Sequence, residues 1–544
     1  MTWQQYSIDR NNLRKLKYFP LYPFLFAVYA VLGVYATNAN EIPVSQIIRP
    51  IVIILIFTGL IFTVIFRLVK NPDRAGFITT LILLWFFYFG HIFFFVPFFP
   101  ILKGIPAKLI VTALAWGGLL FAFGSNKFWH LLSNPHLITT TLNIVAAIVV
   151  VLPLVSTAYV AIETQKQQKV ISAEQSSYPI PELTSSEINP DIYYIILDGY
   201  GRNDVLSEYY GYENSLFTNR LKEKGFFIAD VATSNYMQTE LSLSSILNLR
   251  YLDFLTDGMG NSQNRGPLNN LIRDSVVRKA LEFAGYNFVA LASNVLFTQI
   301  SNADAYLPYS RNSISELEGL LISKTILGAF VDDLGLDLPL PNYATHRRII
   351  NNNFEVIRNL PISDEPMFIF MHILAPHPPF VFNSTGEPIQ PNRPYFIGDA
   401  TGFLGDQEEY IKGYTDEIEY INNQVTTMVD DILEITNGNA IIIIHGDHGP
   451  GAFTSFIDPE RSCLKERFSV LLAIYFPSKE YSSLKGDMSL VNLFPAIFNS
   501  NFQTNIPLLE NRHYFAPWSQ PYKFIDVTSE LLEDCTIEAI PNEQ

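Results

Sequence analysis

Hydrophobic residues in the first part of the chain gather in five long runs, each bordered by polar residues. The runs cover residues 19–37, 47–66, 76–99, 108–124 and 137–161. An α-helix needs about 20 consecutive apolar residues to cross a bilayer. The pattern therefore predicts an N-terminal membrane anchor of five helices in residues 1–161.

The pattern changes beyond residue 161. Residues 162–190 are polar, with Pro and Ser, and indicate a linker or a surface helix. Short apolar runs rich in β-branched and aromatic residues follow at 191–197, 366–373, 440–444 and 468–476, with helix-like stretches at 274–284 and 416–435. Continuous apolar strands are typical of a parallel sheet covered on both faces. We predict a three-layer α/β domain with a mostly parallel sheet at residues 191–525, and a C-terminal tail at 526–544.

Charge divides the chain at the same place. Of the 544 residues, 1–161 hold 11 Lys and Arg against 3 Asp and Glu, a net charge of +8, whereas the remainder carries −24. Eight of the 11 bases precede the first run or lie between runs two and three or between runs four and five, whereas Arg49, Lys103 and Lys108 lie at the opposite ends of the runs. This excess orients a membrane protein with the more basic segments inside. We predict a multi-pass protein of the plasma (inner) membrane, with a cytoplasmic N-terminus and a periplasmic or extracellular α/β domain.

Composition excludes two classes of protein. A net charge of −16 argues against a nucleic-acid partner, which would require a basic surface. Two cysteines, Cys463 and Cys535, are too few for a disulfide scaffold. They could form one disulfide outside the cell, but the sequence does not show whether they meet.

Polar residues of metal-ligand type follow three of the predicted strands. They are Asp198 after the first, His372 and His377 at and after the end of the second, and Asp447 and His448 after the third. In open α/β sheets, ligands bind beyond the carboxyl ends of the strands. The alternative is that these are turn residues, as Asp-Gly after a strand often is. Two carboxylates and an imidazole suit one divalent cation such as Zn²⁺ or Mn²⁺, so we favour a metal site among these residues.

A hydroxyl-rich stretch, residues 233–248, contains a candidate nucleophile. Thr239 lies where a helix is predicted to begin, so the helix dipole would favour its ionised form and nearby amides could hold a phosphate. Coordination by a metal would lower the pKa of the hydroxyl further. The competing interpretation is that Thr239 only caps the helix. From the residues by themselves, the N-cap interpretation is favoured.

The motifs occur in a characteristic order: Asp198-Gly199, Thr239-x-x-Ser242, His372 to His377, and Asp447-His448-Gly449. This order resembles the alkaline phosphatase and sulfatase-like superfamily. Five N-terminal spans, a linker and an outward-facing α/β domain resemble its membrane branch, which includes lipoteichoic acid synthases and lipid A phosphoethanolamine transferases. The resemblance implies metal ligands at Asp198, Thr239, Asp447 and His448, with Thr239 as the nucleophile, and substrate contacts at His372 and His377.

The same resemblance implies a two-step reaction. The threonine attacks a phosphodiester head group of a membrane lipid donor and becomes a covalent phospho-intermediate, and a glycan, lipid or polymer acceptor resolves it. Two alternatives stay open: a phosphodiesterase or phosphatase, in which water resolves the intermediate, and a non-catalytic envelope protein without a metal.

Departures from the family pattern narrow the expectation. Sulfatases convert a Cys or Ser in a C/S-x-P-x-R motif to formylglycine, and the stretch from Cys463 to Arg467 lacks the proline. Sulfatase activity is therefore not expected. Phosphoethanolamine transferases carry a further histidine after the Asp-His pair, whereas none occurs here between His448 and His513. Basic residues in that interval and after the first strand could hold an anionic head group, or face solvent or form salt bridges instead; they are Arg202, Arg461, Lys465 and Arg467.

Overall fold

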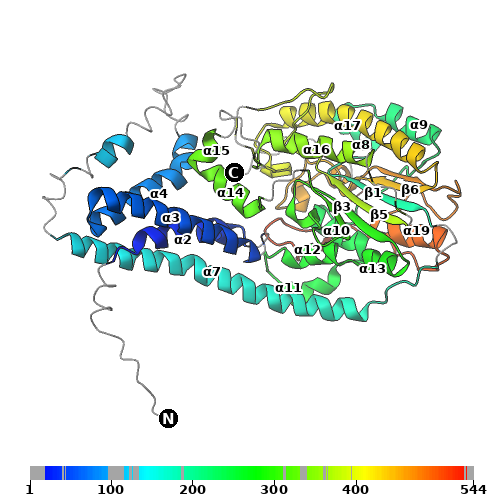
Figure 1. Cartoon of the computed structure of the whole chain (residues 1–544). Coiled ribbons are helices and arrows are strands. Elements are labelled where there is room, and N and C mark those ends of the chain that lie inside the picture. The colour runs from blue at the N-terminus through cyan, green and yellow to red at the C-terminus, as the bar shows by residue number, and fades with distance from the viewer. Residues whose placement is uncertain are drawn as a thin grey trace, which may run out of the picture. The chain divides into compact units, whose positions relative to one another are not determined.

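The computed structural model divides the chain into two compact units. It describes residues 19–39, 42, 44–95, 116–121, 125, 134–184, 189–309, 314–330, 338, 340–358, 360, 363, 365–391, 393, 395–531 and 535. The first unit comprises residues 1–163 and 312–341, and the second comprises 164–311 and 342–544. Each unit is described on its own below (Figure 1).

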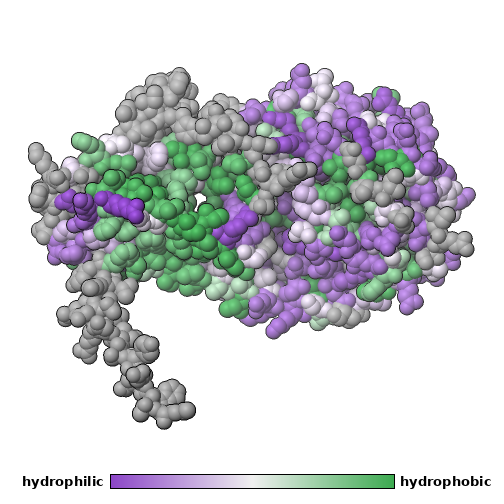
Figure 2. Space-filling view, viewed as in Figure 1, coloured by the Kyte–Doolittle hydropathy of each residue, from purple (hydrophilic) through white to green (hydrophobic). Residues whose placement is uncertain are grey.

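The first unit is helical and apolar. Its described helices include α2 (Tyr22–Thr37), α3 (Ile48–Val69), α4 (Pro72–Phe95) and the first part of α7 (Pro135–Ser177), which correspond to predicted runs one, two, three and five. Two segments, Val44–Val69 and Pro135–Gln175, are long and apolar enough to cross a membrane, and Tyr22–Thr37 is a shorter apolar helix. Figure 2 shows apolar residues gathered over this unit.

The five-helix prediction is thus met only in part. Most of run four, residues 108–124, lies outside the described residues, although 116–121 are helical. Two candidate spans among the described residues support a membrane segment by length and composition alone.

A later stretch of the chain returns to this first unit, which the sequence did not reveal. It forms α14 (Glu316–Lys324) and α15 (Ile326–Phe330), which contact α4, and α14 also contacts α2. Glu318 of α14 forms an ion pair with Arg49 at the start of α3. The insertion escaped prediction because these two helices are far shorter than a membrane span.

The second unit is built on a seven-stranded sheet with strand order β2-β7-β6-β1-β5-β3-β4. Strands β1 (Asp191–Leu197), β5 (Met367–Ile373), β3 (Asn287–Leu291), β4 (Ala305–Leu307) and β6 (Ala440–His445) pair in parallel. Strands β7 (Leu472–Tyr475) and β2 (Phe227–Ile228) add antiparallel pairs at one edge. The predicted α/β class and mostly parallel sheet are confirmed.

Helices cover both faces of the sheet. One hydrophobic cluster joins Tyr193, Ile195 and Leu197 to α8 (Asn203–Tyr210), α9 (Ser215–Glu223), α16 (Tyr343–Ile357) and α17 (Gln407–Ile435). The other joins Ile192, Tyr194 and Ile196 to α10 (Thr239–Leu247), α13 (Val276–Phe283) and α19 (Leu493–Asn501). Successive side chains of a strand point to opposite faces, so the continuous apolar run of β1 supplies both cores.

The remaining described elements are short. They are α11 (Thr256–Met259), α12 (Gly266–Arg273), α18 (Leu464–Phe468) and the hairpin of β8 (Tyr514–Phe515) with β9 (Ile525–Asp526). The α7 helix extends to Ser177, through much of the stretch expected as a linker or surface helix. Cys463 and Cys535 form a disulfide, with their Cα atoms 5.1 Å apart. This bond ties residue 535, in the predicted tail, to the start of α18.

Candidate metal centre and active site

The site lies at the carboxyl ends of the central strands. Parallel register places Ile196 of β1 opposite His372 of β5 on one side and His445 of β6 on the other. The residues that follow these strands therefore meet at one edge of the sheet, where Gly199 N donates to Asp447 Oδ1 at 3.1 Å. This topology explains why Gly199 and Asp447, which are 248 positions apart in the chain, come together.

Glycine is required in the loop after β6. A Cβ atom at Gly446 would lie 2.2 Å from the Tyr200 carbonyl oxygen, and one at Gly449 would lie 2.0 Å from the Glu466 carbonyl oxygen. Only glycine allows so close a backbone approach. The two glycines of Gly-Asp-His-Gly thus allow the segment of Asp447 and His448 to pack between the loop that follows β1 and the backbone at Glu466.

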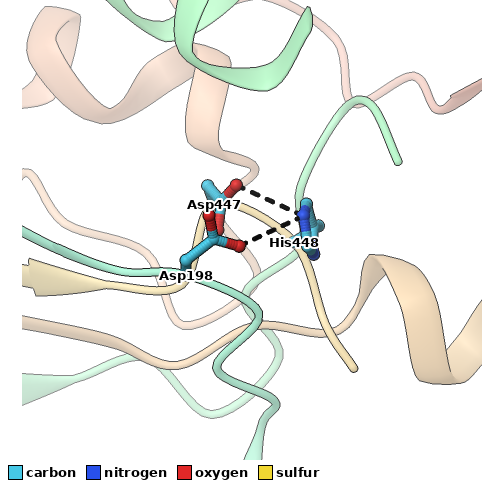
Figure 3. A group of neighbouring side chains, drawn as sticks. All are labelled: Asp198, Asp447 and His448. Atoms are coloured by element: carbon cyan, nitrogen blue, oxygen red, sulfur yellow. Dashed lines mark ion pairs between the residues drawn. The ribbon is translucent and has the colours of Figure 1, made fainter. Parts of the chain in front are cut away.

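Asp198, Asp447 and His448 form a buried cluster of possible metal ligands (Figure 3). His448 Nε2 lies 3.5 Å from Asp198 Oδ1 and 3.4 Å from Asp447 Oδ2. Both of these carboxylate oxygens are buried without a hydrogen-bond partner. Two unpartnered buried carboxylate oxygens are costly unless a cation compensates them, so the donor set fits a divalent metal.

The His448 imidazole is held in the tautomer that a metal ligand requires. Its Nδ1 lies 2.8 Å from the Gly449 carbonyl oxygen and donates to it, which leaves a lone pair on Nε2. Burial, together with the nearby Arg467 guanidinium, lowers the pKa of His448 to about 4. The imidazole is therefore neutral near pH 7, with Nε2 aimed at the two carboxylates.

Thr239 is the first residue of α10 and lies beside this cluster. Its Oγ1 is 3.1 Å from His448 Nε2, and the helix cap position is taken by Gln238, which makes no side-chain capping bond. Thr239 therefore does not serve as the N-cap, which was the competing interpretation of its position. Ser242, one turn later, donates to the Asp447 carbonyl oxygen at 2.6 Å and fastens α10 to the ligand loop.

The two predicted substrate histidines occupy different places. His377 lines the cavity described below. His372 is buried behind Asp198, with Nε2 at 3.1 Å from Asp198 Oδ2 and Nδ1 at 2.8 Å from Thr298 Oγ1. It therefore orients a candidate ligand and does not line the cavity. From this position His372 does not reach the cavity, so the geometry does not support its predicted contact with substrate.

Arg202 also lies away from the cavity. Its guanidinium pairs with both carboxylate oxygens of Asp204, at 2.6 and 2.8 Å, and donates to the Ala232 carbonyl oxygen at 2.9 Å. All three contacts are structural. Of the two interpretations of Arg202, the geometry fits the salt bridge and not the phosphate contact.

Arg467 is the cation that the fold brings to the site. It is 2% exposed, and its Nη2 lies 3.2 Å from His448 Nε2. Its Nη1 pairs with Asp399 Oδ2 at 2.5 Å, and its Nε donates to the Met237 carbonyl oxygen at 2.8 Å. Lys465 instead pairs with Glu208. Asp399 was not anticipated, because no local pattern marks an acid whose partner is 68 positions away.

A cavity of about 430 Å³ opens over these groups. Its lining includes Asp198, Thr239, His448, His377 and Arg467. The rest of the lining is largely apolar and includes Val295, Phe297, Leu374, Phe396, Ile457 and Trp518. Of these, Phe396, Ile457 and Trp518 are half exposed or more, at 53%, 62% and 50%. The site thus combines a cation suited to an anion, Arg467, and carboxylates suited to a metal with apolar groups exposed to solvent.

Comparison with known proteins identifies the family. The family model described as Sulfatase matches residues 190–500, more than half of the chain. The chain therefore belongs to the Sulfatase family. No curated protein matches the chain at a significant level.

The solved structures to which the chain is similar include a transferase and sulfatases by their titles. The periplasmic domain of EptC from Escherichia coli, solved also with Zn, is 13% identical, with a TM-score of 0.40 over 64% of this chain and 96% of that one. The periplasmic domain of the phosphoethanolamine transferase EptC from Campylobacter jejuni is 12% identical, with a TM-score of 0.35 over 63% and 97%. A 2-O GAG sulfatase is 16% identical, with a TM-score of 0.36 over 59% and 72%.

Proposed function

We propose that this member of the Sulfatase family is a membrane-anchored, metal-dependent transferase of phospho head groups, acting outside the cytoplasm. One observation carries the proposal. Thr239 Oγ1, at the N-terminus of α10, lies 3.1 Å from His448 Nε2, beside two buried carboxylate oxygens without hydrogen-bond partners. A hydroxyl in that position suits a nucleophile activated by a cation held by Asp198, Asp447 and His448.

The residues of the chain divide the chemistry between them. In the first step, Thr239 Oγ1 forms a bond to phosphorus, and the bond from phosphorus to the lipid glycerol oxygen breaks. When bound, a Zn²⁺ or Mn²⁺ ion supplies the positive charge that favours the threonine alkoxide. The hydroxyl proton passes to solvent, and the glycerol oxygen takes up a proton from solvent at the cavity side lined by His377. Arg467 compensates charge on the phosphoryl oxygens.

The second step returns Thr239 to its free state. An acceptor hydroxyl forms the new bond to phosphorus, the bond to Thr239 Oγ1 breaks, and the acceptor proton is released. The N-terminus of α10 presents backbone amides toward the phosphorylated threonine, which favours the negatively charged intermediate. If water replaces the acceptor, the same residues give a hydrolase.

The shape of the cavity supports a lipid donor. A phospholipid joins an anionic head group to apolar chains, and the cavity joins Arg467 and His377 to the exposed apolar side chains of Phe396, Ile457 and Trp518. Aromatic residues such as Trp are enriched at the interface between membrane and water. A soluble sugar phosphate would leave these apolar groups in contact with water.

The Arg49–Glu318 pair supports the proposed orientation. Arg49 lies in the first turn of α3, at the end that the basic loops assign to the outside, and Lys70 follows α3 at the end assigned to the inside. Glu318 belongs to the insertion between two strands of the α/β unit. Its partner at the outer end of α3 is the one expected if the α/β unit lies outside.

Formylglycine-dependent sulfate hydrolysis has no support at this site. Formylglycine derives from Cys or Ser, and the residue facing His448 at the start of α10 is Thr239. Both cysteines of the chain, Cys463 and Cys535, are joined in a disulfide. Family membership therefore indicates the fold and the metal-type site more than the reaction.

The test is to trap the intermediate. The full-length protein in detergent is incubated with Mn²⁺ or Zn²⁺ and vesicles whose lipids carry phosphoglycerol or phosphoethanolamine head groups, then digested and analysed by mass spectrometry. We expect the added mass of one head group on the Thr239 peptide and none in Thr239→Ala, which should also lose turnover. Thr427→Ala, an exposed threonine of α17, is the matched control and should behave as wild type.

Each other outcome has a defined meaning. Full turnover in Thr239→Ala excludes the nucleophile. Release of free head group at a rate independent of any added acceptor indicates the hydrolase. Metal dependence is contradicted if the wild-type protein binds neither Mn²⁺ nor Zn²⁺ and the Asp447→Ala variant keeps wild-type turnover.

A further inference from the structure

The two neighbours of Thr239 are held by a single buried arginine that the proposed chemistry does not use. Arg265 Nη1 lies 3.2 Å from Glu240 Oε2, and its Nη2 donates to Gln238 Oε1 at 2.6 Å. The residues before and after Thr239 in the chain are thus fixed by one planar guanidinium. Arg265 is 4% exposed and is not among the residues that line the cavity.

Arg265 also contacts the segment around Trp518. Nη2 also donates to the Trp518 carbonyl oxygen at 3.0 Å, and the guanidinium carbon lies 4.1 Å from the centre of the Trp518 ring. Gln238 in turn donates through Nε2 to the Ala516 carbonyl oxygen at 2.6 Å. Arg265 therefore links the start of α10 to the segment that carries Trp518 at the cavity mouth.

The loop that carries Arg265 is itself anchored. The adjacent Asn264 donates through Nδ2 to Gln167 Oε1 at 2.8 Å and to Thr164 Oγ1 at 2.7 Å, both on α7. Its carbonyl oxygen accepts from the Tyr522 hydroxyl at 2.6 Å. Arg265 thus acts from a fixed point, which a residue that sets the position of another must have.

We propose that Arg265 is a positioning residue that holds Thr239 Oγ1 at its distance from His448 and the two carboxylates. The inference rests on the proposed function of Thr239 as nucleophile. Gln238 at the helix cap makes no capping bond of its own, so the start of α10 is not fixed by local capping. The two terminal nitrogens of the Arg265 guanidinium, Nη1 and Nη2, supply that constraint from outside the helix. Lysine has the charge but not the fork, and cannot hold both neighbours in one plane.

The consequence is a specific kinetic defect. A misplacement of the nucleophile of about 1 Å costs about 100-fold in rate without changing substrate binding in proportion. Arg265→Lys should therefore lower kcat by about 10- to 100-fold and leave KM within about twofold. The hydrogen bonds of Arg265 reach Glu240, Gln238 and the Trp518 carbonyl oxygen and none of Asp198, Asp447 and His448, the residues proposed to hold the cation. The affinity for Mn²⁺ should therefore not change.

The chain offers a matched control in Arg278. Its guanidinium also pairs with one glutamate, Glu282 at 2.7 Å, donates to two carbonyl oxygens, of Arg273 and Asn302 at 2.9 Å each, and lies 4.5 Å from the ring centre of Phe288. It has no contact with α10 among these bonds. Arg278→Lys removes a similar buried fork and should lower the melting temperature by a similar amount, with kcat unchanged.

The experiment measures kcat, KM, Mn²⁺ affinity, single-turnover labelling of Thr239 and melting temperature for Arg265→Lys, Arg265→Gln and Arg278→Lys in the full chain. The inference predicts slow labelling and low kcat in the Arg265 variants only, with wild-type Mn²⁺ affinity. Wild-type kcat in folded Arg265→Lys overturns it. A fall in kcat that Arg278→Lys shares also overturns it. Failure of both Arg265 variants to fold, while Arg278→Lys folds, overturns it too, because each of these outcomes indicates a purely structural role for Arg265.

Failure of the two proposals is distinguishable. If Thr239→Ala remains active, the proposed function fails whatever the Arg265 variants show. If Thr239→Ala is inactive and Arg265→Lys is fully active, the nucleophile stands and only the role of Arg265 is refuted.

Discussion

His372 Nε2 lies 3.1 Å from Asp198 Oδ2, and both side chains are almost wholly buried, with exposures of 0% and 1%. The imidazole donates to one carboxylate oxygen and so turns the other, Oδ1, toward His448 Nε2 at 3.5 Å. The two residues sit at the ends of neighbouring strands, β1 and β5. The sheet itself therefore orients a candidate metal ligand.

The first prediction concerns this orientation. His372→Ala should weaken the binding of Mn²⁺ or Zn²⁺ by about 10- to 100-fold, the usual cost of losing an outer partner of a metal ligand. His372→Gln can still donate to Asp198 and should lose less. Titration calorimetry of the purified full chain measures both.

His445→Gln is the matched control. His445 is equally buried on β6, but its ring contacts the Tyr194 hydroxyl at 3.0 Å and the Gly446 carbonyl oxygen at 2.9 Å. The metal affinity of the His445→Gln variant should stay near that of the wild-type protein. Unchanged affinity in His372→Ala would show that Asp198 is oriented without it.

The second prediction concerns the buried pair of Arg467 and Asp399. Burial by itself would raise the pKa of the Asp399 carboxyl, but Arg467, with His377 and His448, holds that pKa well below its ordinary value. Arg467→Met would leave a buried carboxylate with the Tyr410 hydroxyl as its remaining partner in this set, at 2.6 Å. Removing one partner of a buried pair costs about 3–5 kcal/mol.

Thermal melting of the full-length protein at pH 7 checks this. Arg467→Met should melt well below wild type and lose turnover, since the phosphoryl oxygens lose their cation. Adding Asp399→Asn removes the stranded charge and should recover part of the melting temperature but none of the turnover. A double variant that melts no higher than Arg467→Met would contradict this account.

The third prediction concerns pH. Glu417 of α17 is fully buried, with Oε1 accepting from Val381 N at 3.0 Å and Oε2 without a partner, and burial raises its pKa to about 8. The folded chain thus keeps a proton on Glu417 that the unfolded chain releases above pH 4.5, the ordinary pKa of a glutamate. Stability should therefore fall as the pH rises through the window from about 4.5 to about 8.

Glu417→Gln mimics the protonated carboxyl and removes this dependence. The melting temperature of the variant should fall less between pH 5.5 and pH 8.5 than that of wild type. Glu419→Gln, on the exposed side of the same helix, is the control and should follow wild type. Parallel curves for wild type and Glu417→Gln would show that Glu417 is ionised in the folded chain.

The sequence predicted those parts of the fold that depend on continuous apolar runs. β1, β5 and β6 are buried on both faces, so their runs stand out, and the ligand-type residues after them were visible for the same reason. β2 and β4 were missed because they are only 2 and 3 residues long and partly exposed. β3 was missed although it is buried, since its 5 residues make a weaker signal than β1.

Contacts between distant segments of the chain limit how much of the candidate site could be predicted from the sequence. Asp198, Asp447 and Thr239 each follow or begin a recognisable element, so their positions could be anticipated from topology. Nothing in the sequence separates Arg467, buried at the site, from Arg202, paired with Asp204 elsewhere. Only the packing of α18 against the cavity distinguishes them. The role of His372 behind Asp198 likewise depends on side-chain direction, which strand order does not determine.

The fourth prediction uses the disulfide to test both stability and location. Cys463 and Cys535 close a loop across 72 positions, and α18, which carries Arg467, begins directly after Cys463. A crosslink of that span stabilises by about 4 kcal/mol in the chain-entropy model. Reduction, or Cys535→Ser, should therefore lower the melting temperature by several degrees, whereas a reductant should not affect Cys535→Ser further.

The same bond reports the compartment. Disulfides persist in oxidising compartments and are rare in the cytosol. In membranes isolated with thiols blocked, the wild-type chain should resist thiol labelling until a reductant is added, and Cys535→Ser should label at once at Cys463 after unfolding. If the wild-type chain labels fully without a reductant, the α/β domain faces a reducing compartment. The proposal of an external phosphotransferase would then be wrong in its location.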